Sequence, residues 1–590
     1  MADLTIPGDA AVPPPVHVRS QPGNTIWRDV LLFLGLFAAA AAFRLIGLDW
    51  DSYHPDENPS AAARVLTGQL SVSSFYPPLL DYLTALAYAA LYVVGRALSW
   101  WPSAEAFRAA YFEDRDTFYL TSRLVTTALS ALIAPLTFLL AATHGVSRLG
   151  ATIAGAAAAL IPGSVFWAHI AKSDVALAPA FLFVVIASSA VVRRPSDNWR
   201  TMLLGLAIAL AISVKHSAIF FVAPFLLITL FSSRRWRTEL LSVRTVLIIA
   251  LSALLFWIPL NIGIVIDPQT FLDAQLVQTS MSVRSSEIWS SVDATVTALT
   301  SADAGLPHWL LPLWVAVVLA LAFWPAITQP QLEFRNVMLT FAAATAFAVV
   351  VLAYLGGARQ PTNLWLPYAS LMAVLILIVA AAVLDRATTT SRVVAAGVLA
   401  MTIAAFILRL VPIVNQSVAP SNGERVAGVI KSALPPGSAV LSAIDLEPWL
   451  PISPASAIEQ RARHERLAMK YDIQLPPPDR PLPRDRADAY KVVPFPFVFG
   501  GLEALEEDQV KTVVAYAWPL QPDEWRLDYW RERGYHYVVA DDGGRTHPVE
   551  AYRSFYQELD ARCERVADVP SSKPLYWEQD ILVYNCGAAT

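Results

Sequence analysis

Ionisable side chains gather at a few boundaries between apolar and polar sequence, and their types are those that act on phosphate and hydroxyl groups. The first group is Tyr53-His54-Pro55-Asp56-Glu57-Asn58, which follows the first long apolar segment. The second is His169-Ile170-Ala171-Lys172-Ser173-Asp174, which leads directly into another apolar segment. Isolated cations follow at Lys215-His216 and at Arg359. Ionisable residues at membrane boundaries are costly and often mark the path of a substrate.

These residue types favour the transfer of a group from an anionic lipid phosphate. A carboxylate such as Asp56 or Glu57 can deprotonate an attacking hydroxyl. A cation such as Lys215 or Arg359 can stabilise the phosphate that leaves. Taken singly, each residue also has a structural explanation, because lysine and arginine side chains extend to lipid headgroups and histidines are common at interfaces. The gathering of acids and cations on one face favours the functional interpretation.

The chain that positions these groups is a membrane protein by composition. Of its 590 residues, 55% are hydrophobic and only 15% are charged, and the mean hydropathy is +0.47. Soluble domains are about 45–50% apolar and about 25% charged. Lipid cannot satisfy open backbone groups, so the apolar segments are predicted to be helices. The net charge of −5 and the lack of a basic face argue against a nucleic-acid partner.

The arginines indicate the topology. They cluster in short loops at Arg148, at Arg193, Arg194 and Arg200, at Arg234, Arg235, Arg237 and Arg244, at Arg335, and at Arg386 and Arg392. By the positive-inside rule these loops are cytoplasmic, together with the N-terminus. About eleven spans satisfy this rule if the segment 201–232 forms two short helices with an outer turn near Lys215-His216. The other spans are expected near 27–48, 121–143, 149–168, 174–192, 244–266, 307–328, 335–355, 363–384 and 391–412.

One further apolar segment, 79–98, does not fit as a span, because spanning would move every later arginine loop outside. It is predicted to be a re-entrant or interfacial helix within an outer loop, 49–120. Residues 1–25 are expected to be a disordered cytoplasmic tail, 26–412 a transmembrane catalytic module, and 413–590 an extracytoplasmic α/β domain. High Ala, Arg and Pro with few Lys are typical of a GC-rich bacterial genome, so the predicted location is a bacterial inner membrane.

The last domain has recognisable local signals. A helix is expected at Asn422–Leu434 with Ser421 as its cap, and an extended loop at Pro476–Pro496. Strands are expected at Ala439–Ile444, Thr512–Trp518, Tyr535–Ala540 and Ile581–Tyr584. Cys563 and Cys586 are expected to form a disulfide, since both belong to a domain placed outside, where oxidation is permitted. The alternative is two buried free thiols.

The order of short motifs carries a family resemblance. Pro77-Pro78-Leu79 comes some twenty residues after the acidic pair, Arg123-Leu124 opens one span and Asp174 opens another. Leu204-Gly205-Leu206-Ala207 running to Lys215, Gly305-Leu306-Pro307, and Arg359 with Leu366-Pro367 complete the series. This succession resembles the GT-C superfamily, in particular protein O-mannosyltransferases and aminoarabinose transferases. The chain departs from the mannosyltransferases at Tyr76, where they have histidine, and at Lys172-Ser173, which replaces a Ser-Arg element.

The resemblance implies an inverting glycosyltransferase that uses a polyprenyl-phosphate-linked sugar as donor and a glycan, lipid or protein as acceptor. Asp56 would be the base with Glu57 beside it, Asp174 would hold acceptor or metal, and Lys215 and Arg359 would hold the donor phosphate. The substrate-binding residues are completed by His54, Lys172, Arg123 and His216. Some members of the superfamily use a divalent metal and others none, so a metal is left open, with Asp56, Asp174 and His169 as candidate ligands.

Three alternatives remain at this stage. Within the enzyme class, the chain could be a lipid-linked oligosaccharide transferase or a polymer ligase. From other classes, it could be a lipid or solute transporter, or a membrane scaffold whose last domain binds a partner. A transporter would favour inverted repeats and broken helices, neither of which is evident in the sequence.

Overall fold

A computed structural model gives the fold. It describes residues 23–49, 54, 57, 59–70, 76–113, 115–232, 234–282, 309–324, 329–356, 366–386, 389–471, 482–494, 522–546, 550–576 and 578–587. The predicted strand at Thr512–Trp518 and the predicted tail up to residue 22 lie outside these residues.

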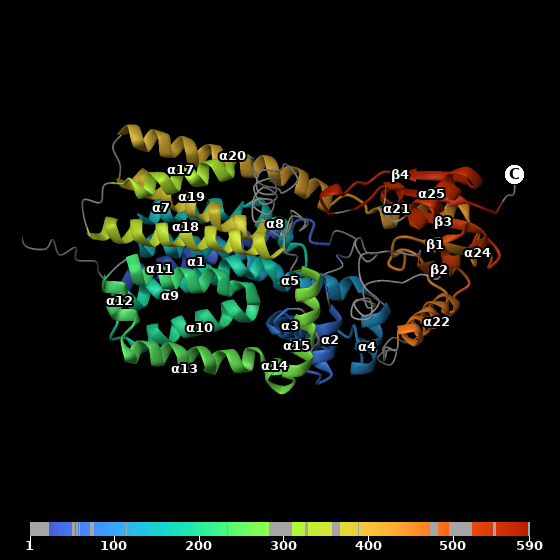
Figure 1. The fold of residues 1–590 in the computed structure, drawn as a ribbon, viewed down its shortest axis with the longest axis horizontal. Coiled ribbons are helices and arrows are strands. Elements are labelled where there is room, and N and C mark those ends of the chain that lie inside the picture. The colour runs from blue at the N-terminus through green and yellow to red at the C-terminus, as the bar shows by residue number, and fades with distance from the viewer. Residues whose placement is uncertain are drawn as a thin grey trace, which may run out of the picture.

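Long apolar helices form a bundle, and a smaller domain follows at one end of it (Figure 1). The helices up to the second domain are α1 (Gly23–Leu45), α2 (Pro59–Leu66), α3 (Leu79–Ala97), α4 (Ala104–Glu113), α5 (Arg115–Ala131), α6 (Ile133–Thr143), α7 (Arg148–Ala159), α8 (Pro162–Ala168), α9 (Asp174–Arg193), α10 (Asn198–Val214), η1 (His216–Ala218), α11 (Ile219–Ser232), α12 (Arg234–Leu240), α13 (Val243–Leu260), α14 (Ile262–Ile266), α15 (Pro268–Ser282), α17 (Leu310–Ala322), α18 (Gln329–Gly356), α19 (Leu366–Arg386) and α20 (Thr389–Ser417).

The helix lengths support the predicted class of fold, a multi-pass membrane protein. Among the described residues, eight helices are long and apolar enough to cross a membrane, or nine if the bent pair α7–α8 counts as one span. Shorter apolar helices lie at Asn198–Val214, His216–Phe231 and Leu310–Ala322. Without α3, the other seven long helices, the bent pair and the three shorter helices correspond to the eleven predicted segments. The predicted division of 201–232 near Lys215-His216 is confirmed, because α10 ends at Val214 and η1 begins at His216.

The helix α3 is one of the eight helices that pass on length and composition. It packs against α2 and α5. The interfacial placement of this segment stays a prediction.

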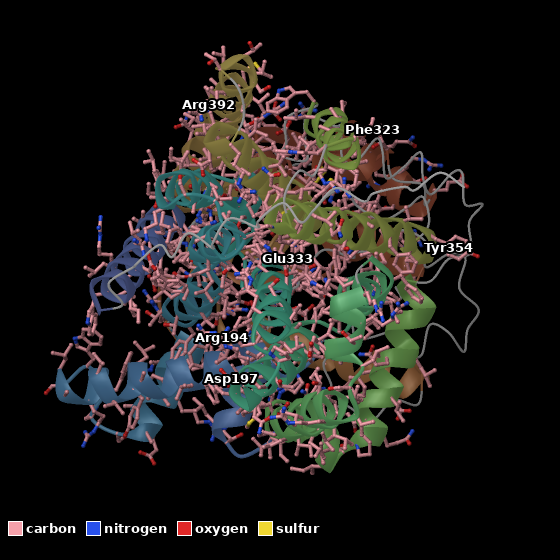
Figure 2. All side chains as sticks on the ribbon, turned by 90° about the vertical axis from the view of Figure 1, so that its left-hand side faces the viewer. Arg194, Asp197, Phe323, Glu333, Tyr354 and Arg392 are labelled. Carbon is pink, nitrogen blue, oxygen red and sulfur yellow. A yellow bond between two sulfur atoms is a disulfide. The ribbon has the colours of Figure 1, made fainter. Side chains whose placement is uncertain are left out.

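The arginine-bearing loops meet at one end of the bundle. Arg148 pairs with Asp29 of α1 at 2.9 Å, Arg386 donates to the carbonyl of His144 at 2.9 Å, and Arg193 approaches the His144 ring at 3.5 Å. Figure 1 shows α12 at this same end, opposite to the second domain. Figure 2 views the molecule from this end, with Arg194 and Arg392 labelled there. The predicted topology requires these arginine-bearing loops to lie at the same end of the bundle, and the structure shows that they do.

The pair α7–α8 corrects one expectation, since the sequence showed no broken helix. The two helices meet at a bend of 51°, because Pro162 begins α8 and cannot donate a backbone hydrogen bond to α7. Arg44 of α1 donates hydrogen bonds to both helices at the bend. Its buried guanidinium donates to the carbonyl of Ala159 at 3.1 Å and to the hydroxyl of Ser164 at 2.9 Å. It also donates to Ser130 at 2.8 Å.

The tight packing of α10 against α13 explains a glycine of the family motif. A Cβ at Gly205 would lie 2.8 Å from the backbone nitrogen of Ala253 and 2.8 Å from the carbonyl oxygen of Ile249. Real Cβ atoms do not approach backbone so closely. Gly205 therefore allows α10 and α13 to pack closely, and α10 ends directly before Lys215.

The second domain has the predicted α/β class, with helices on both faces of a mixed sheet, and it follows α20, which ends at Ser417. Its elements are α21 (Asn422–Ala433), β1 (Ala439–Ser442), α22 (Pro454–Tyr471), β2 (Lys491–Pro494), η5 (Pro522–Trp525), α24 (Leu527–Arg531), β3 (Tyr537–Asp541), η6 (Asp542–Thr546), α25 (Glu550–Arg562), β4 (Glu564–Val569), η7 (Pro574–Tyr576) and β5 (Ile581–Asn585). The strand order is β2-β1-β3-β5-β4, with β1 parallel to β2 and to β3 and the other pairs antiparallel. Alternate residues face opposite sides, so Val538 packs with α24 and α25, whereas Val539 packs with α21.

The local predictions for this domain are largely confirmed. Ser421 caps α21 by accepting a hydrogen bond from the Glu424 amide at 3.1 Å. Strands β1, β3 and β5 lie where strands were expected. The stretch 476–496 was wrongly predicted to be only a loop, because it contains β2, whose sequence Lys-Val-Val-Pro is too short for a clear pattern. The strand β4 was missed because most of its residues are exposed.

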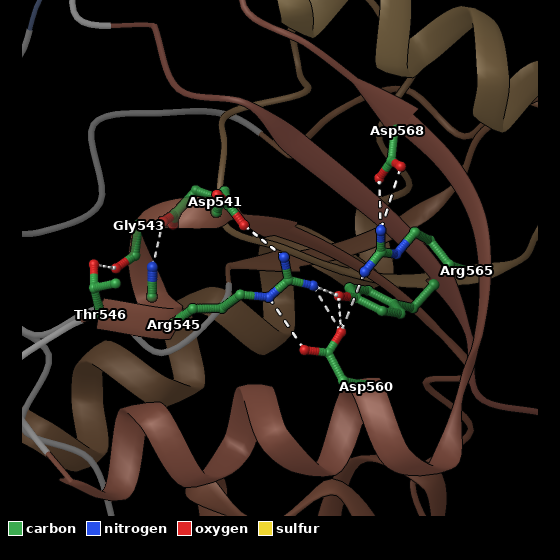
Figure 3. Close-up of polar contacts among 10 residues, drawn as sticks. Asp541, Gly543, Arg545, Thr546, Asp560, Arg565 and Asp568 are labelled. Carbon is green, nitrogen blue, oxygen red and sulfur yellow. Dashed lines mark hydrogen bonds and ion pairs between the residues drawn. The ribbon is translucent and has the colours of Figure 1, made fainter.

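A network of ion pairs joins the turn after β3 to α25 and β5 (Figure 3). Arg545 of η6 donates to Asp542 at 2.7 Å, to Asp560 at 2.7 Å and to the Tyr584 hydroxyl at 2.9 Å. The nearby Arg565 pairs with Asp568. These groups are partly exposed, and each such pair contributes only about 0–1 kcal/mol. The network has a structural role, because it orients α25 on the sheet.

Cys563 and Cys586 form the predicted disulfide, with a Cα–Cα distance of 4.4 Å. They flank the hairpin of β4 and β5. Replacing both by serine is expected to lower the free energy of unfolding of this domain by about 3 kcal/mol in the chain-entropy model, because the bond closes a loop with a sequence separation of 23. Hydrogen exchange of the β5 amides measures the effect. The β5 amides of the wild type in a phosphine reductant should exchange at the same rate as those of the double serine variant. Equal exchange rates in oxidised and reduced wild-type protein would contradict this expectation.

Candidate active site

Glu57 and Arg123 form a buried ion pair at the end of the bundle that faces the second domain. Arg123, on α5, donates from Nε and Nη2 to the two carboxylate oxygens, both at 2.8 Å. The two side chains are 0% and 2% exposed. Glu57 also accepts from the backbone nitrogens of His54 at 2.9 Å and Ala171 at 2.8 Å. One carboxylate thus joins the segment after α1, the helix α5 and the segment before α9.

Two lysines converge on Asp174, the first residue of α9. The Lys172 ammonium lies 3.7 Å from one carboxylate oxygen, and the Lys215 ammonium pairs with the other. Asp174 and Lys172 are 1% and 3% exposed, while Lys215 is 14% exposed. Lys215 follows the last residue of α10 in an extended conformation. The structure therefore brings together three of the residues that the sequence singled out, from two different loops.

Aromatic rings line the space around these charges. Both ammonium groups lie 5.7 Å from the centre of the Tyr76 ring, and Lys172 lies 5.6 Å from the Trp167 ring. His54 meets the same Trp167 ring edge to face at 6.4 Å. A cation over an aromatic face is stabilised by the ring quadrupole. Tyr76 and Trp167 were not among the predicted site residues, although Tyr76 precedes the Pro-Pro-Leu motif and marks a departure from the family pattern.

His169 lies beside this cluster but contacts the second domain. Its Nδ1 is 2.7 Å from the Tyr576 hydroxyl, and the two rings stack with centres 6.2 Å apart. His169 is 0% exposed, and burial lowers the pKa of its imidazole to about 3. The ring is therefore neutral and engaged with Tyr576.

Two of the remaining predicted residues, Asp56 and Arg359, lie outside the described residues. His216, in η1, meets the ring of Phe271 edge to face at 5.1 Å. In the described part of the chain, no group of three or more His, Cys, Asp or Glu residues could hold a metal ion.

One cavity lies among the outer segments, and a second lies between them and the second domain. A cavity of about 290 Å³ is lined by Glu57, Phe112, Arg115 and Tyr119 among others. A larger cleft of about 980 Å³ shares Phe112 and Arg115 with it and extends along Trp449 and Tyr490 of the second domain. Arg115 also pairs with Asp445 and Glu447, each at 3.2 Å. The ion pair of Glu57 and Arg123 thus lies next to a path that opens toward the second domain.

Comparison with known proteins confirms the resemblance that the motifs suggested. Residues 65–276 match the family model of the dolichyl-phosphate-mannose-protein mannosyltransferases. No curated protein sequence matches the chain.

Two solved structures are similar to the chain. One is ArnT from Cupriavidus metallidurans bound to undecaprenyl phosphate, with 13% identity, a TM-score of 0.47, and coverage of 95% of this chain and 98% of that chain. The other is the oligosaccharyltransferase AglB from Archaeoglobus fulgidus in complex with an inhibitory peptide and a dolichol-phosphate, with 13% identity, a TM-score of 0.44, and coverage of 87% and 70%.

Proposed function

We propose that this membrane glycosyltransferase transfers a sugar from a polyprenyl-phosphate-linked donor to an acceptor hydroxyl, with inversion, at the outer face of a bacterial inner membrane. The observation that carries the proposal is the convergence of Lys172 and Lys215 on Asp174 beneath Tyr76. An ammonium group can exchange a carboxylate oxygen for a phosphate oxygen as its partner, because both are anionic acceptors. The family match to enzymes that use dolichyl-phosphate-mannose supports the same donor chemistry.

The proposed reaction is a single displacement. The acceptor hydroxyl attacks the anomeric carbon from the face opposite to the phosphate, and a carboxylate takes the hydroxyl proton. The bond between the anomeric carbon and the phosphate oxygen breaks, and the polyprenyl phosphate leaves with the electron pair. Lys215 and Lys172 stabilise the charge that develops on this oxygen. Attack from the opposite face inverts the anomeric configuration.

The two acids of the motif are assigned different roles. Both oxygens of Glu57 accept hydrogen bonds from Arg123, and each also accepts one from a backbone nitrogen. These four hydrogen bonds hold the carboxylate between three segments of the chain. We therefore assign Glu57 to positioning and Asp56 to the role of base. Arg359 stays a proposed further cation for the donor phosphate, on the evidence of its place in the motif series alone.

The acceptor is proposed to reach the site from the second domain. The cavity beside Glu57 and the cleft along Trp449 and Tyr490 share lining residues, which gives an extended acceptor a continuous route. Aromatic rings mixed with charged side chains suit a hydroxyl-rich acceptor, because the rings cover apolar faces while the charged groups take hydrogen bonds. The arginine-rich end lies opposite, which by the positive-inside rule supports an outer location for this route.

The bend in α7–α8 does not favour the transporter alternative. Transporters use broken helices to hold a substrate near the middle of the membrane. Here the backbone group at the break is held by Arg44. The lysine cluster lies instead where α9 begins and α10 ends, close to the contact with the second domain.

Lys215→Ala is expected to weaken the binding of a short-chain polyprenyl phosphate by about 10- to 100-fold, the range for a hydrogen bond to a charged group. Binding of the acceptor should change much less. Lys491→Ala is a matched control, because the Lys491 ammonium also pairs with a carboxylate, that of Glu459 at 2.7 Å, and lies 4.8 Å from an aromatic ring. It lies in the second domain and should leave donor affinity unchanged.

Unchanged donor affinity and rate in Lys215→Ala would leave Lys215 as a structural residue of the turn. A second measurement tests the stereochemistry. The anomeric configuration of the product, compared with that of the donor by NMR, should be inverted. Retention would exclude the single inverting displacement.

A further inference from the structure

The hairpin of β4 and β5 reaches from the second domain into the bundle. Tyr576, in the loop that joins the two strands, is 3% exposed and belongs to the apolar cluster of the bundle rather than to either cluster of its own domain. Its ring packs against Phe166 of α8 with centres 4.8 Å apart. In Figure 1 the red hairpin extends back toward α20. A side chain of the second domain thus forms part of the core of the membrane module.

Tyr576 makes polar contacts with Ser417 at the end of α20 and with the segment that carries the candidate site. Its hydroxyl bonds to His169 at 2.7 Å, and His169 is three residues before Lys172. The backbone between them is tightly turned, with the Lys172 nitrogen donating to the Ile170 carbonyl at 2.7 Å. The Ala171 nitrogen donates to Glu57. A displacement of His169 would therefore move both the lysine and the contact to Glu57.

The loop that presents Tyr576 is held in place on both sides. Glu578 accepts from the backbone nitrogens of Ser572 and Lys573, each at 3.1 Å, which closes the loop on itself. The Leu575 nitrogen donates to Gln416 of α20 at 2.8 Å, and the Asn422 nitrogen donates to Glu578 at 2.6 Å. The loop has a fixed conformation and a fixed position on the end of α20.

The disulfide closes the base of the same hairpin. Cys563 immediately precedes β4 and Cys586 immediately follows β5. The two strands pair in antiparallel fashion, with an irregularity in register between Arg565 and Ala567. A covalent bond at the open end limits how far this irregular pair can slide or separate, and so limits the movement of the loop at its tip.

We propose that Tyr576 is a positioning residue, which fixes the segment 169–174 through His169, and that the disulfide Cys563–Cys586 maintains this positioning. The proposal rests on the proposed function insofar as Lys172 and Asp174 serve the donor phosphate. Activity would then depend on oxidation of a bond in the second domain, although neither cysteine touches substrate. The enzyme would reach full donor affinity only after export of this domain to an oxidising compartment.

Tyr576→Phe tests the first part with the full-length protein in nanodiscs. Phenylalanine keeps the packing against Phe166 and removes only the hydroxyl, so the fold should persist. We expect the KM for the donor to rise about three- to tenfold, the equivalent of one neutral hydrogen bond, with a smaller change in kcat. Hydrogen exchange of the amides at 170–173 should become faster. Tyr552→Phe removes the hydroxyl of a buried tyrosine that bonds to Asp541 and Tyr556 of the second domain, and it should leave both readouts unchanged.

The second part is tested by a double-mutant cycle. Cys563→Ser with Cys586→Ser should raise the donor KM in the wild-type background and should have little further effect in the Tyr576→Phe background, because the positioning contact is already lost. Additive effects would overturn the link between the disulfide and Tyr576. Wild-type exchange rates at 170–173 in Tyr576→Phe would overturn the positioning role. A chain that neither binds a polyprenyl phosphate nor transfers sugar would instead overturn the proposed function, and the exchange measurement would still decide the positioning role.

Discussion

Asp56→Asn is expected to lower kcat for sugar transfer by about 10²–10⁴-fold, the usual contribution of a positioned base. Asparagine has nearly the same shape as aspartate but cannot accept the proton of the attacking hydroxyl. The neighbouring Glu57 cannot readily replace it, since both of its oxygens are held by Arg123 in a buried pair. Expression and affinity for a polyprenyl phosphate should stay close to those of the wild type, because the fold and the lysine cluster are unchanged.

Initial rates with a polyprenyl-phosphate-linked sugar give the measurement. Glu105→Gln is the control, because Glu105 is an exposed acid in the first turn of α4 in the same outer loop. It should turn over at the wild-type rate. Near-normal turnover of Asp56→Asn would remove Asp56 from the role of base and would make Glu57 the next candidate.

Arg123→Met is expected to lower the free energy of unfolding by about 3–5 kcal/mol, the cost of leaving one partner of a buried ion pair uncompensated. Methionine fills similar space but leaves the Glu57 carboxylate, 0% exposed, without its guanidinium. Transfer activity should also fall, because Glu57 would no longer hold the segment beside Asp56. Unfolding by SDS in mixed micelles measures the change in stability.

Arg115→Met provides the comparison on the same helix. Arg115 pairs with two carboxylates as well, but its side chain is 31% exposed, so the expected loss is at most about 1 kcal/mol. Adding Glu57→Gln to Arg123→Met should recover part of the stability, since the buried charge is then removed. Equal losses for Arg123→Met and Arg115→Met would contradict the assignment of a buried, structurally essential pair.

The gathering of the arginine loops at one end of the bundle was predictable, because it depends on where arginines fall along the sequence. The loops that contain Arg148, Arg193 and Arg386 lie together, which left Lys172, Asp174 and Lys215 for the opposite end. Two of these residues are close in sequence and open one helix, so their proximity needed no knowledge of the tertiary fold. The third residue, Lys215, lies at the turn between two short helices, and the arginine pattern required a turn at that place.

Contacts between distant segments were not predictable from local pattern. Arg123 was expected to bind substrate, but its guanidinium pairs with Glu57, 66 positions away. Tyr576 contacts His169 across 407 positions. Nothing in the sequence around Tyr576 distinguishes a tyrosine that enters the bundle from one that packs in its own domain. The break after α7 did have a signal, Pro162 within an apolar run, but the run continued beyond it and was interpreted as one span.

The buried Arg44 has a consequence for the biogenesis of the protein. A helix that bends by 51° within a bilayer exposes backbone carbonyls, and in hydrocarbon each unsatisfied polar group costs several kcal/mol. The group that satisfies the Ala159 carbonyl comes from α1, 115 positions earlier in the chain. An isolated arginine on α1 is itself costly in lipid. Ala40 lies on α1 and Ser130 on α5, but two of the partners of Arg44, Ala159 and Ser164, are available only when α7 and α8 have been synthesised. We therefore expect α1 to stay beside the translocon until the bent pair emerges.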